Sequence, residues 1–129
     1  MRIFGFNLNI VIMSKTYNYP NLKFPVADET DVILDVKYIS DGNSSNTLIY
    51  TPGIDDRNLQ GQGKINIGKG KQLRAQTTYI TTNLNNPVPH VQNIKVEYKL
   101  NGELIISHSN PVSETRSAII NLDIDFPAQ

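Results

Sequence analysis

The chain of 129 residues contains no cysteine and no tryptophan. Without cysteine it has no disulfide framework, no thiolate nucleophile and no cysteine-ligated zinc site. The chain therefore also lacks the Cys and Trp residues that mark antibody-type immunoglobulin domains. Twelve basic and twelve acidic side chains cancel, so no overall field draws the protein onto a polyanion, and we expect no nucleic-acid partner.

Long apolar runs are also lacking. The apolar stretch at the start of the chain is interrupted by Asn7 and Asn9 and is far shorter than the about 18 residues that a membrane span needs. It has one cation, Arg2, and no A-x-A-like cleavage site, which makes it a poor signal peptide. We therefore predict no membrane span and a soluble protein, cytoplasmic rather than secreted. Residues 1–13 are interpreted as an N-terminal extension or an added strand, and residues 14–129 as a single domain.

No segment of helical length places apolar residues at three- and four-residue spacing, whereas period-two alternation recurs along the chain. Residues 32–39 and 117–126 show it most clearly. The first segment places Val32, Leu34, Val36 and Tyr38 on one face, and the second is predicted to point Ile120, Leu122, Ile124 and Phe126 inward. Residues 17–26, interrupted by two prolines, predict an extended edge segment. Residues 47–51 predict a short strand that pairs with 32–39, and the glycine-rich residues 52–72 predict a stretch that is mostly loop.

Short strands separated by Gly, Pro and Asn clusters are typical of two stacked antiparallel sheets. We predict an all-β fold, an antiparallel β-sandwich of about seven strands with an immunoglobulin-like or C2-like topology. The threonine-rich segment 73–84 is polar on both faces, which predicts an edge or partly exposed strand. The like charges of Asp123 and Asp125 on the last strand also suit an edge that must avoid pairing with other molecules.

The Asn101-Gly102 pair between two alternating runs predicts a β-hairpin. A two-residue loop would pair Leu100 with Glu103, whereas a three-residue loop with a bulge at Gly102 pairs Lys99 with Glu103 and makes one face wholly apolar. Burying a Leu or Ile side chain contributes roughly 1.5–3 kcal/mol and a cross-strand pair only about 0.2–1 kcal/mol. We therefore predict the three-residue loop, with these residues inward: Ile94, Val96, Tyr98, Leu104 and Ile106.

The segment from Gly63 to Gly70 nearly matches the phosphate-binding pattern G-x-x-x-x-G-K-[ST]. Gly70 stands where a hydroxyl residue is required, and no helix is predicted after it, so we interpret the segment as a glycine-rich β-connection. Its cations could still contact an anionic partner. The candidate binding residues are Asp55, Asp56, Arg57, Lys64, Lys69, Lys71, Arg74 and Tyr79.

Two acidic clusters could offer oxygen ligands to calcium, Asp55-Asp56 and the residues Asp28, Glu29 and Asp31. The twelve-residue calcium loop with its closing Glu is absent, so we predict no metal and no cofactor. His90 and His108 are the only histidines, and neither pairs with another metal ligand at four-residue spacing. We expect His90 to be exposed in a loop and His108 to be a partly covered structural residue opposite Ile94.

No set of residues points to catalysis, so we predict that the protein is not an enzyme. The sequence favours a non-enzymatic interaction or assembly module that contacts a protein partner or itself through loops or an edge strand, with segment 74–82 as the candidate edge. The alternative is a sandwich that binds a small ligand or carbohydrate, possibly with the help of calcium. Its stacking surfaces would come from Tyr17, Tyr19, Tyr50 and Tyr79.

Overall fold

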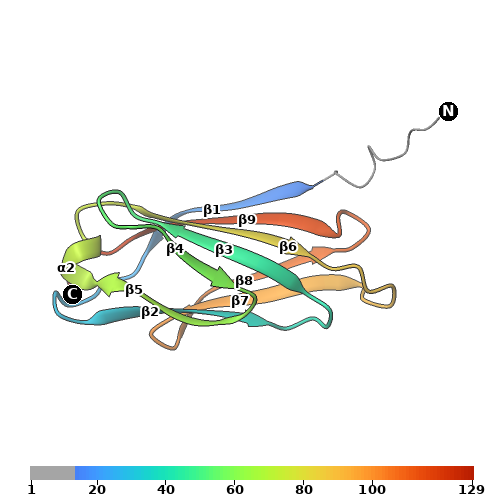
Figure 1. Ribbon diagram of the computed structural model, residues 1–129, viewed down its shortest axis with the longest axis horizontal. Helices are drawn as coiled ribbons and strands as arrows, with labels where there is room; N and C mark the ends of the chain where they lie inside the picture. The colour runs from blue at the N-terminus through green and yellow to red at the C-terminus, as the bar shows by residue number, and fades with distance from the viewer. Residues whose placement is uncertain (1–13) are drawn as a thin grey trace.

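A computed structural model describes residues 14–129. The predicted extension or added strand at residues 1–13 lies outside the described residues. Within residues 14–129, strands dominate, and the one helix has four residues (Figure 1). The elements are β1 (Lys15–Lys23), β2 (Asp31–Tyr38), β3 (Ser44–Tyr50), β4 (Arg57–Gln60), β5 (Gly63–Lys69), α2 (Gly70–Leu73), β6 (Thr78–Asn85), β7 (Asn93–Leu100), β8 (Glu103–Pro111) and β9 (Ser117–Asp125).

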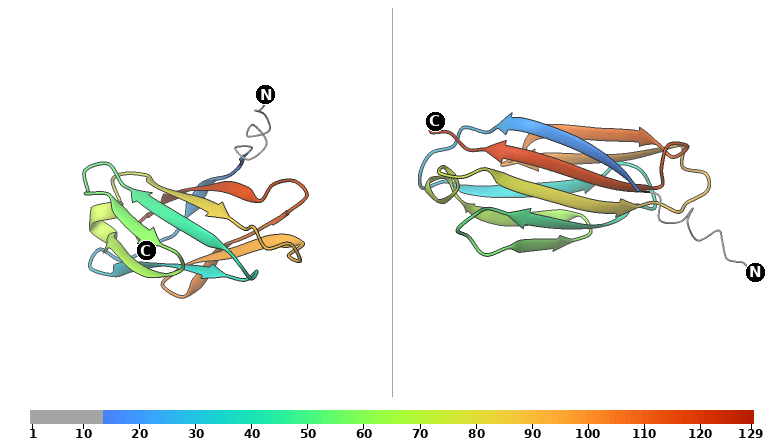
Figure 2. Two further views of the ribbon diagram at one scale, coloured as in Figure 1. Left: turned by 45° about the vertical axis from the view of Figure 1, so that its right-hand side comes forward. Right: turned by 90° about the horizontal axis from the view of Figure 1, so that it is seen from above.

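The strands form two sheets packed face to face, which confirms the predicted all-β sandwich but with nine strands in place of about seven. One sheet has the order β1-β9-β6-β3-β4, seen from above in Figure 2, and the other has the order β5-β2-β7-β8. Among the named strands, β1 and β9 run parallel and all other neighbours run antiparallel. The chain crosses from the five-stranded to the four-stranded sheet at Gly61 and Gln62, because β4 belongs to the first and β5 to the second.

Alternating side chains of both sheets meet in a dry core. On β9 the predicted inward residues Ile120, Leu122 and Ile124 are fully buried. The core also contains a hydroxyl link between the layers, in which Tyr98 of β7 donates to Thr82 Oγ1 of β6 at 2.7 Å, and Thr82 in turn bonds Thr47 of β3 at 2.9 Å. Burial raises the pKa of Tyr98, so its hydroxyl remains a donor.

The predicted three-residue hairpin loop is wrong. Leu100 pairs with Glu103 and Lys99 with Leu104, so the loop is the two residues Asn101 and Gly102, whose φ angles of 49° and 82° suit a type I′ turn. A bulge between Tyr98 and Lys99 then shifts the register, which returns Ile106 to a half-buried position against the core. Leu104 is 50% exposed and does not reach the core, whereas Ile94, Val96 and Tyr98 are fully buried as predicted.

The predicted strand neighbours also need correction. Segment 73–84 contains most of β6, which is not an edge strand, since it lies between β9 and β3, but is partly exposed on its outer face. Strand β9, with Asp123 and Asp125, lies between β1 and β6. Strands β2 and β3 lie in different sheets and do not pair, and residues 52–72 contain β4 and β5 rather than mostly loop. The extended edge segment predicted at residues 17–26 is confirmed by β1.

Candidate functional site

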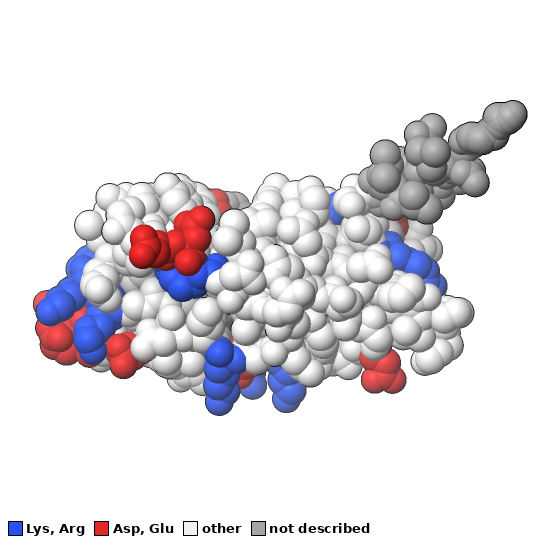
Figure 3. Space-filling model, viewed as in Figure 1, with Lys and Arg blue, Asp and Glu red and all other residues white. Residues whose placement is uncertain are grey.

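The predicted cations near α2 lie against the predicted acidic cluster at the same end of the molecule. Figure 3 shows the gathering of both charge types there. The ion pairs are Lys69–Asp31 at 3.2 Å, Lys71–Glu29 at 2.8 Å and Arg74–Asp28. The hydrogen bond with Glu29 raises the pKa of Lys71. Two clusters considered separately in the sequence, one for anions and one for calcium, therefore neutralise each other.

The remaining predicted charged residues lie elsewhere. Asp55 and Asp56 occupy the connection between β3 and β4, and Arg57 begins β4. The Arg57 guanidinium folds back, donating to the Asp55 carbonyl at 2.8 Å and to Thr51 Oγ1 at 3.0 Å, and desolvation lowers its pKa. Lys64 is exposed on β5 opposite Asp35. These four residues do not converge with the cations near α2.

Within residues 14–129, no three His, Asp or Glu side chains come together in a way that could hold a metal ion. No helix in the same part of the chain is long and apolar enough to cross a membrane.

The outer face of the five-stranded sheet is the most distinctive surface. We call it the amide face, because asparagine is its commonest residue; its charged residues are Asp123 and, at the ends of β9 and β1, the paired Asp125 and Lys23. The register and the alternation with buried neighbours place these side chains on it: Thr16, Asn18, Ser44, Asn46, Leu48, Tyr50, Asn58, Gln60, Tyr79, Thr81, Asn83, Asn85, Ser117, Ile119, Asn121 and Asp123.

Polar side chains of the amide face are linked across three strands. Thr81 Oγ1 of β6 donates to Asn121 Oδ1 of β9 at 2.9 Å, and Asn121 Nδ2 donates to Asn18 Oδ1 of β1 at 2.9 Å. These bonds hold the amides in fixed orientations and leave further donor and acceptor capacity toward solvent, since each amide offers two donors and two acceptor lone pairs.

The outer face of the four-stranded sheet has a different character. Charged side chains of both signs alternate with buried apolar ones along β2, β5 and β7. They are Asp35, Lys37, Lys64, Lys95, Glu97 and Lys99. Figure 3 shows a broad area free of charged side chains over the front of the five-stranded sheet. One side of the sandwich is therefore strongly solvated, and the other can be covered with little loss of charge solvation.

Tyr50 of β3 and Tyr79 of β6 form an exposed aromatic pair on the amide face. They are register partners, their ring centroids lie 6.2 Å apart, and their ring planes are inclined by 23°. The two residues are 44% and 43% exposed, and Leu48, on the same strand as Tyr50, is 41% exposed. These large side chains on neighbouring strands form an exposed, largely apolar patch.

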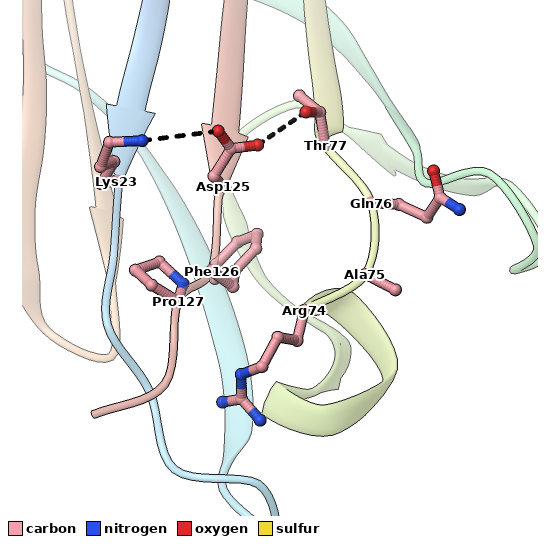
Figure 4. Close-up of a pocket in the computed structure, with 8 residues that line it drawn as sticks. All are labelled: Lys23, Arg74, Ala75, Gln76, Thr77, Asp125, Phe126 and Pro127. Carbon is pink, nitrogen blue, oxygen red and sulfur yellow. Dashed lines mark hydrogen bonds and ion pairs between the residues drawn. The ribbon is translucent and has the colours of Figure 1, made fainter.

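An open cleft continues this surface beyond Tyr79. It has a volume of about 330 Å³, and Figure 4 shows Thr77 and Lys23 on either side of Asp125 at its rim. Thr77 donates to the Asp125 carboxylate at 2.6 Å, and Lys23 lies 3.7 Å from it. The charged rim groups are thus paired within the protein.

Tyr79 was predicted as a binding residue from the sequence, but its neighbours Leu48, Thr81 and Asn121 were not. The sequence signal for this face lies in the outward side chains that alternate with the buried ones along each strand. In residues 44–50, 79–85 and 117–123, every second side chain lies on one face of the sheet, and all of these side chains except Asp123 are uncharged.

Tyr17 and Tyr19 do not belong to this surface, because they turn toward His108. The Tyr19 hydroxyl lies 2.7 Å from His108 Nδ1, and His108 Nε2 lies 2.8 Å from Asn110 Oδ1. Asn110 Nδ2 already donates to two carbonyls, so its Oδ1 accepts. His108 therefore carries its hydrogen on Nε2 and accepts from Tyr19 at Nδ1.

The prediction that His108 is only partly covered and faces Ile94 is wrong. It is fully buried and pairs with Val96. The edge of the sandwich covers it, since the Tyr17 ring lies edge-on at 4.8 Å between ring centroids. Tyr17 also donates to Glu114, which Lys15 approaches to 3.2 Å. His90 is exposed in a loop as predicted.

Acid is expected to destabilise the protein through His108. Desolvation lowers the pKa of His108 below its usual 6.5, so the unfolded chain binds the proton more readily. The resulting stability is fully present above about pH 6.5 and is lost as the pH falls below it, by at most about 1.4 kcal/mol per pH unit. Urea unfolding at pH 7.5 and 5.5 measures the difference in the free energy of unfolding between the two pH values. This difference should be smaller in His108→Gln and unchanged in His90→Gln. An equal loss in His108→Gln would contradict the assignment.

No known protein family, curated protein or solved structure matches the chain.

Proposed function

We propose that the protein is a non-enzymatic binding module that engages a neutral carbohydrate on its amide face. The exposed pair of Tyr50 and Tyr79, surrounded by amides and hydroxyls with the Asp123 carboxylate opposite Tyr79, supports this proposal most directly. It favours the carbohydrate alternative over binding at the threonine-rich edge, because β6 is a central strand.

The chemistry of the amide face suits sugar hydroxyls. A hydroxyl both donates and accepts, as do the Asn and Thr side chains linked across β1, β9 and β6. The rings of Tyr50 and Tyr79 offer apolar faces to the C–H groups of a pyranose and polar hydroxyls at their tips. A neutral ligand requires no ionic partner, and the acidic cluster near α2 is already paired with cations, so the proposal does not include calcium.

Removal of either aromatic ring should weaken carbohydrate binding. We expect Tyr79→Ala or Tyr50→Ala to lower affinity by about tenfold, the equivalent of about 1.4 kcal/mol. A glycan array identifies the neutral glycan, and titration calorimetry measures its affinity. Leu104→Ala is the matched control, because Leu104 is equally exposed but lies on β8 of the other sheet. Equal affinities in all three variants, or no binding to any neutral glycan, would refute the proposal.

A protein partner is the second candidate for the same surface. Protein interfaces are enriched in tyrosine and depleted of charge at their centre, as the amide face is. Asn83 is exposed on β6. The substitution Asn83→Lys would place a positive charge there, and a protein that covers the amide face would have to desolvate that charge. Binding of a purified partner that Asn83→Lys abolishes, together with a blank glycan array, would select this candidate.

A further inference from the structure

Strand β1 is an edge strand that pairs with β9 alone and is less buried than β9. None of its nine residues is buried, whereas alternate residues of its neighbour β9 are fully buried. In its first half, Tyr17 and Tyr19 are half-buried against the edge of the core, and the polar contacts are Tyr17 and Lys15 with Glu114, Tyr19 with His108, and Asn18 with Asn121. This half, residues 14–19, is therefore held by its pairing with β9, by polar contacts that water can replace and by two half-buried rings, with no fully buried side chain of its own.

The two halves of β1 are separated by a built-in break. The register with β9 shifts between Tyr19 and Leu22, Pro20 has no N–H to donate, and Asn21 has a φ of 62°. Beyond the break the chain is anchored, because Phe24 and Val26 are buried and their N–H groups bond to β9 and the residues after it at 2.9 and 3.0 Å. Residues 14–19 therefore form an arm that can leave β9 about a hinge at Pro20 and Asn21.

We propose that this arm exchanges between two copies of the chain, so that the arm of each copy pairs with β9 of the other. Departure of the arm leaves β9 as an open sheet edge along Ala118–Leu122, and an open edge accepts a strand. The strand that fits this edge in register is an identical arm. All arm contacts re-form in the exchanged dimer, and only the hinge changes conformation.

The inference goes beyond carbohydrate binding and does not depend on it. Tyr50 and Tyr79 lie on β3 and β6, two and one strands away from β9, so the exchange leaves the aromatic pair in place.

The natural absence of cysteine makes a clean test possible. Thr16 and Ile119 are register partners in β1 and β9, within reach of a disulfide. Full-length Thr16→Cys and Ile119→Cys proteins are mixed at high concentration, oxidised and separated by mass. We expect a Thr16→Cys/Ile119→Cys covalent heterodimer, because these two positions meet between copies only after exchange.

The matched control uses the anchored half of β1. Lys23 and Asp125 are register partners, and Lys23→Cys mixed with Asp125→Cys should give at least tenfold less heterodimer. Equal yields from both mixtures, or no heterodimer from the first, would overturn arm exchange. The chain carrying both Thr16→Cys and Ile119→Cys reports on folding, since its internal disulfide forms in the folded monomer and should abolish exchange.

The hinge offers an independent readout. A β-branched residue at a φ of 62° is strained, so Asn21→Val should disfavour the closed arm and raise the heterodimer yield or its rate of formation about tenfold. Unchanged exchange in Asn21→Val would exclude Asn21 as the hinge.

Discussion

Tyr98→Ala is expected to lower the free energy of unfolding by about 3–5 kcal/mol, the cost of removing a large buried aromatic ring. Tyr98 is fully buried in β7, and its ring fills the space between the sheets while its hydroxyl reaches Thr82 of the opposite layer. Domains of this kind are stable by only about 5–15 kcal/mol, so the variant would lose a large share of its stability. Urea unfolding followed by circular dichroism measures the change.

Tyr98→Phe separates the ring from the hydroxyl. It keeps the packing and removes one hydrogen bond, while Thr82 retains its bond to Thr47, so we expect a loss of about 1 kcal/mol. A Tyr98→Ala protein no less stable than Tyr98→Phe would show that the ring does not pack as described.

Gly70→Ala is expected to destabilise the protein by about 3 kcal/mol, the upper end of the range for overpacked interiors. Helix propensity alone predicts the opposite sign, since alanine is the better helix former. A Cβ on Gly70 would lie 2.2 Å from the backbone oxygen of Ala27 and 3.0 Å from a Val26 side-chain carbon. The Gly70 N–H also donates to Thr30 at 2.9 Å, which fixes its position against that loop.

Gln76→Ala is the control, because Gln76 is exposed in the connection just after α2 and should change stability little. Thermal unfolding of the two variants compares them directly. A Gly70→Ala protein as stable as the unsubstituted chain would mean that the loop at Ala27 moves aside freely.

Apolar side chains recur at every second position along the strands, and this alternation predicted the fold class because each strand of a sandwich buries one of its two faces. It predicted the inward faces of β2 and β9 correctly for the same reason. It failed at the hairpin, where we assumed a uniform register along the strands and placed the bulge in the loop at Gly102 rather than opposite Tyr98 and Lys99. The turn preference of Asn101-Gly102 decided the loop, the Asn101 side chain bonded the Ile33 N–H at 2.7 Å, and the bulge corrected the phase of Ile106.

Strand β6 shows a second limit. Its threonines read as polar on both faces, which is typical of an edge. In the fold, Thr78 and Thr82 are fully buried because each hydroxyl meets another threonine, Thr51 at 2.7 Å and Thr47 at 2.9 Å. Such pairs satisfy buried hydroxyls, but the partners lie 27 and 35 residues away. Composition alone does not reveal them.

The candidate site was visible in part. Tyr79 and Tyr50 were both considered as stacking residues, but the sequence did not show that they are register partners. The cations near α2 looked available because their acidic partners lie about 40 residues away in the chain. Pairing between distant segments decides both outcomes, and local pattern does not encode it.

The parallel pairing of β1 with β9 has a mechanical consequence. A stretching force applied before Lys15 and after Asp125 acts along both strands in opposite directions, because the two strands point the same way. Their backbone hydrogen bonds are then loaded together in shear rather than broken one after another. The same strand that is proposed to leave β9 sideways should resist being drawn out lengthwise.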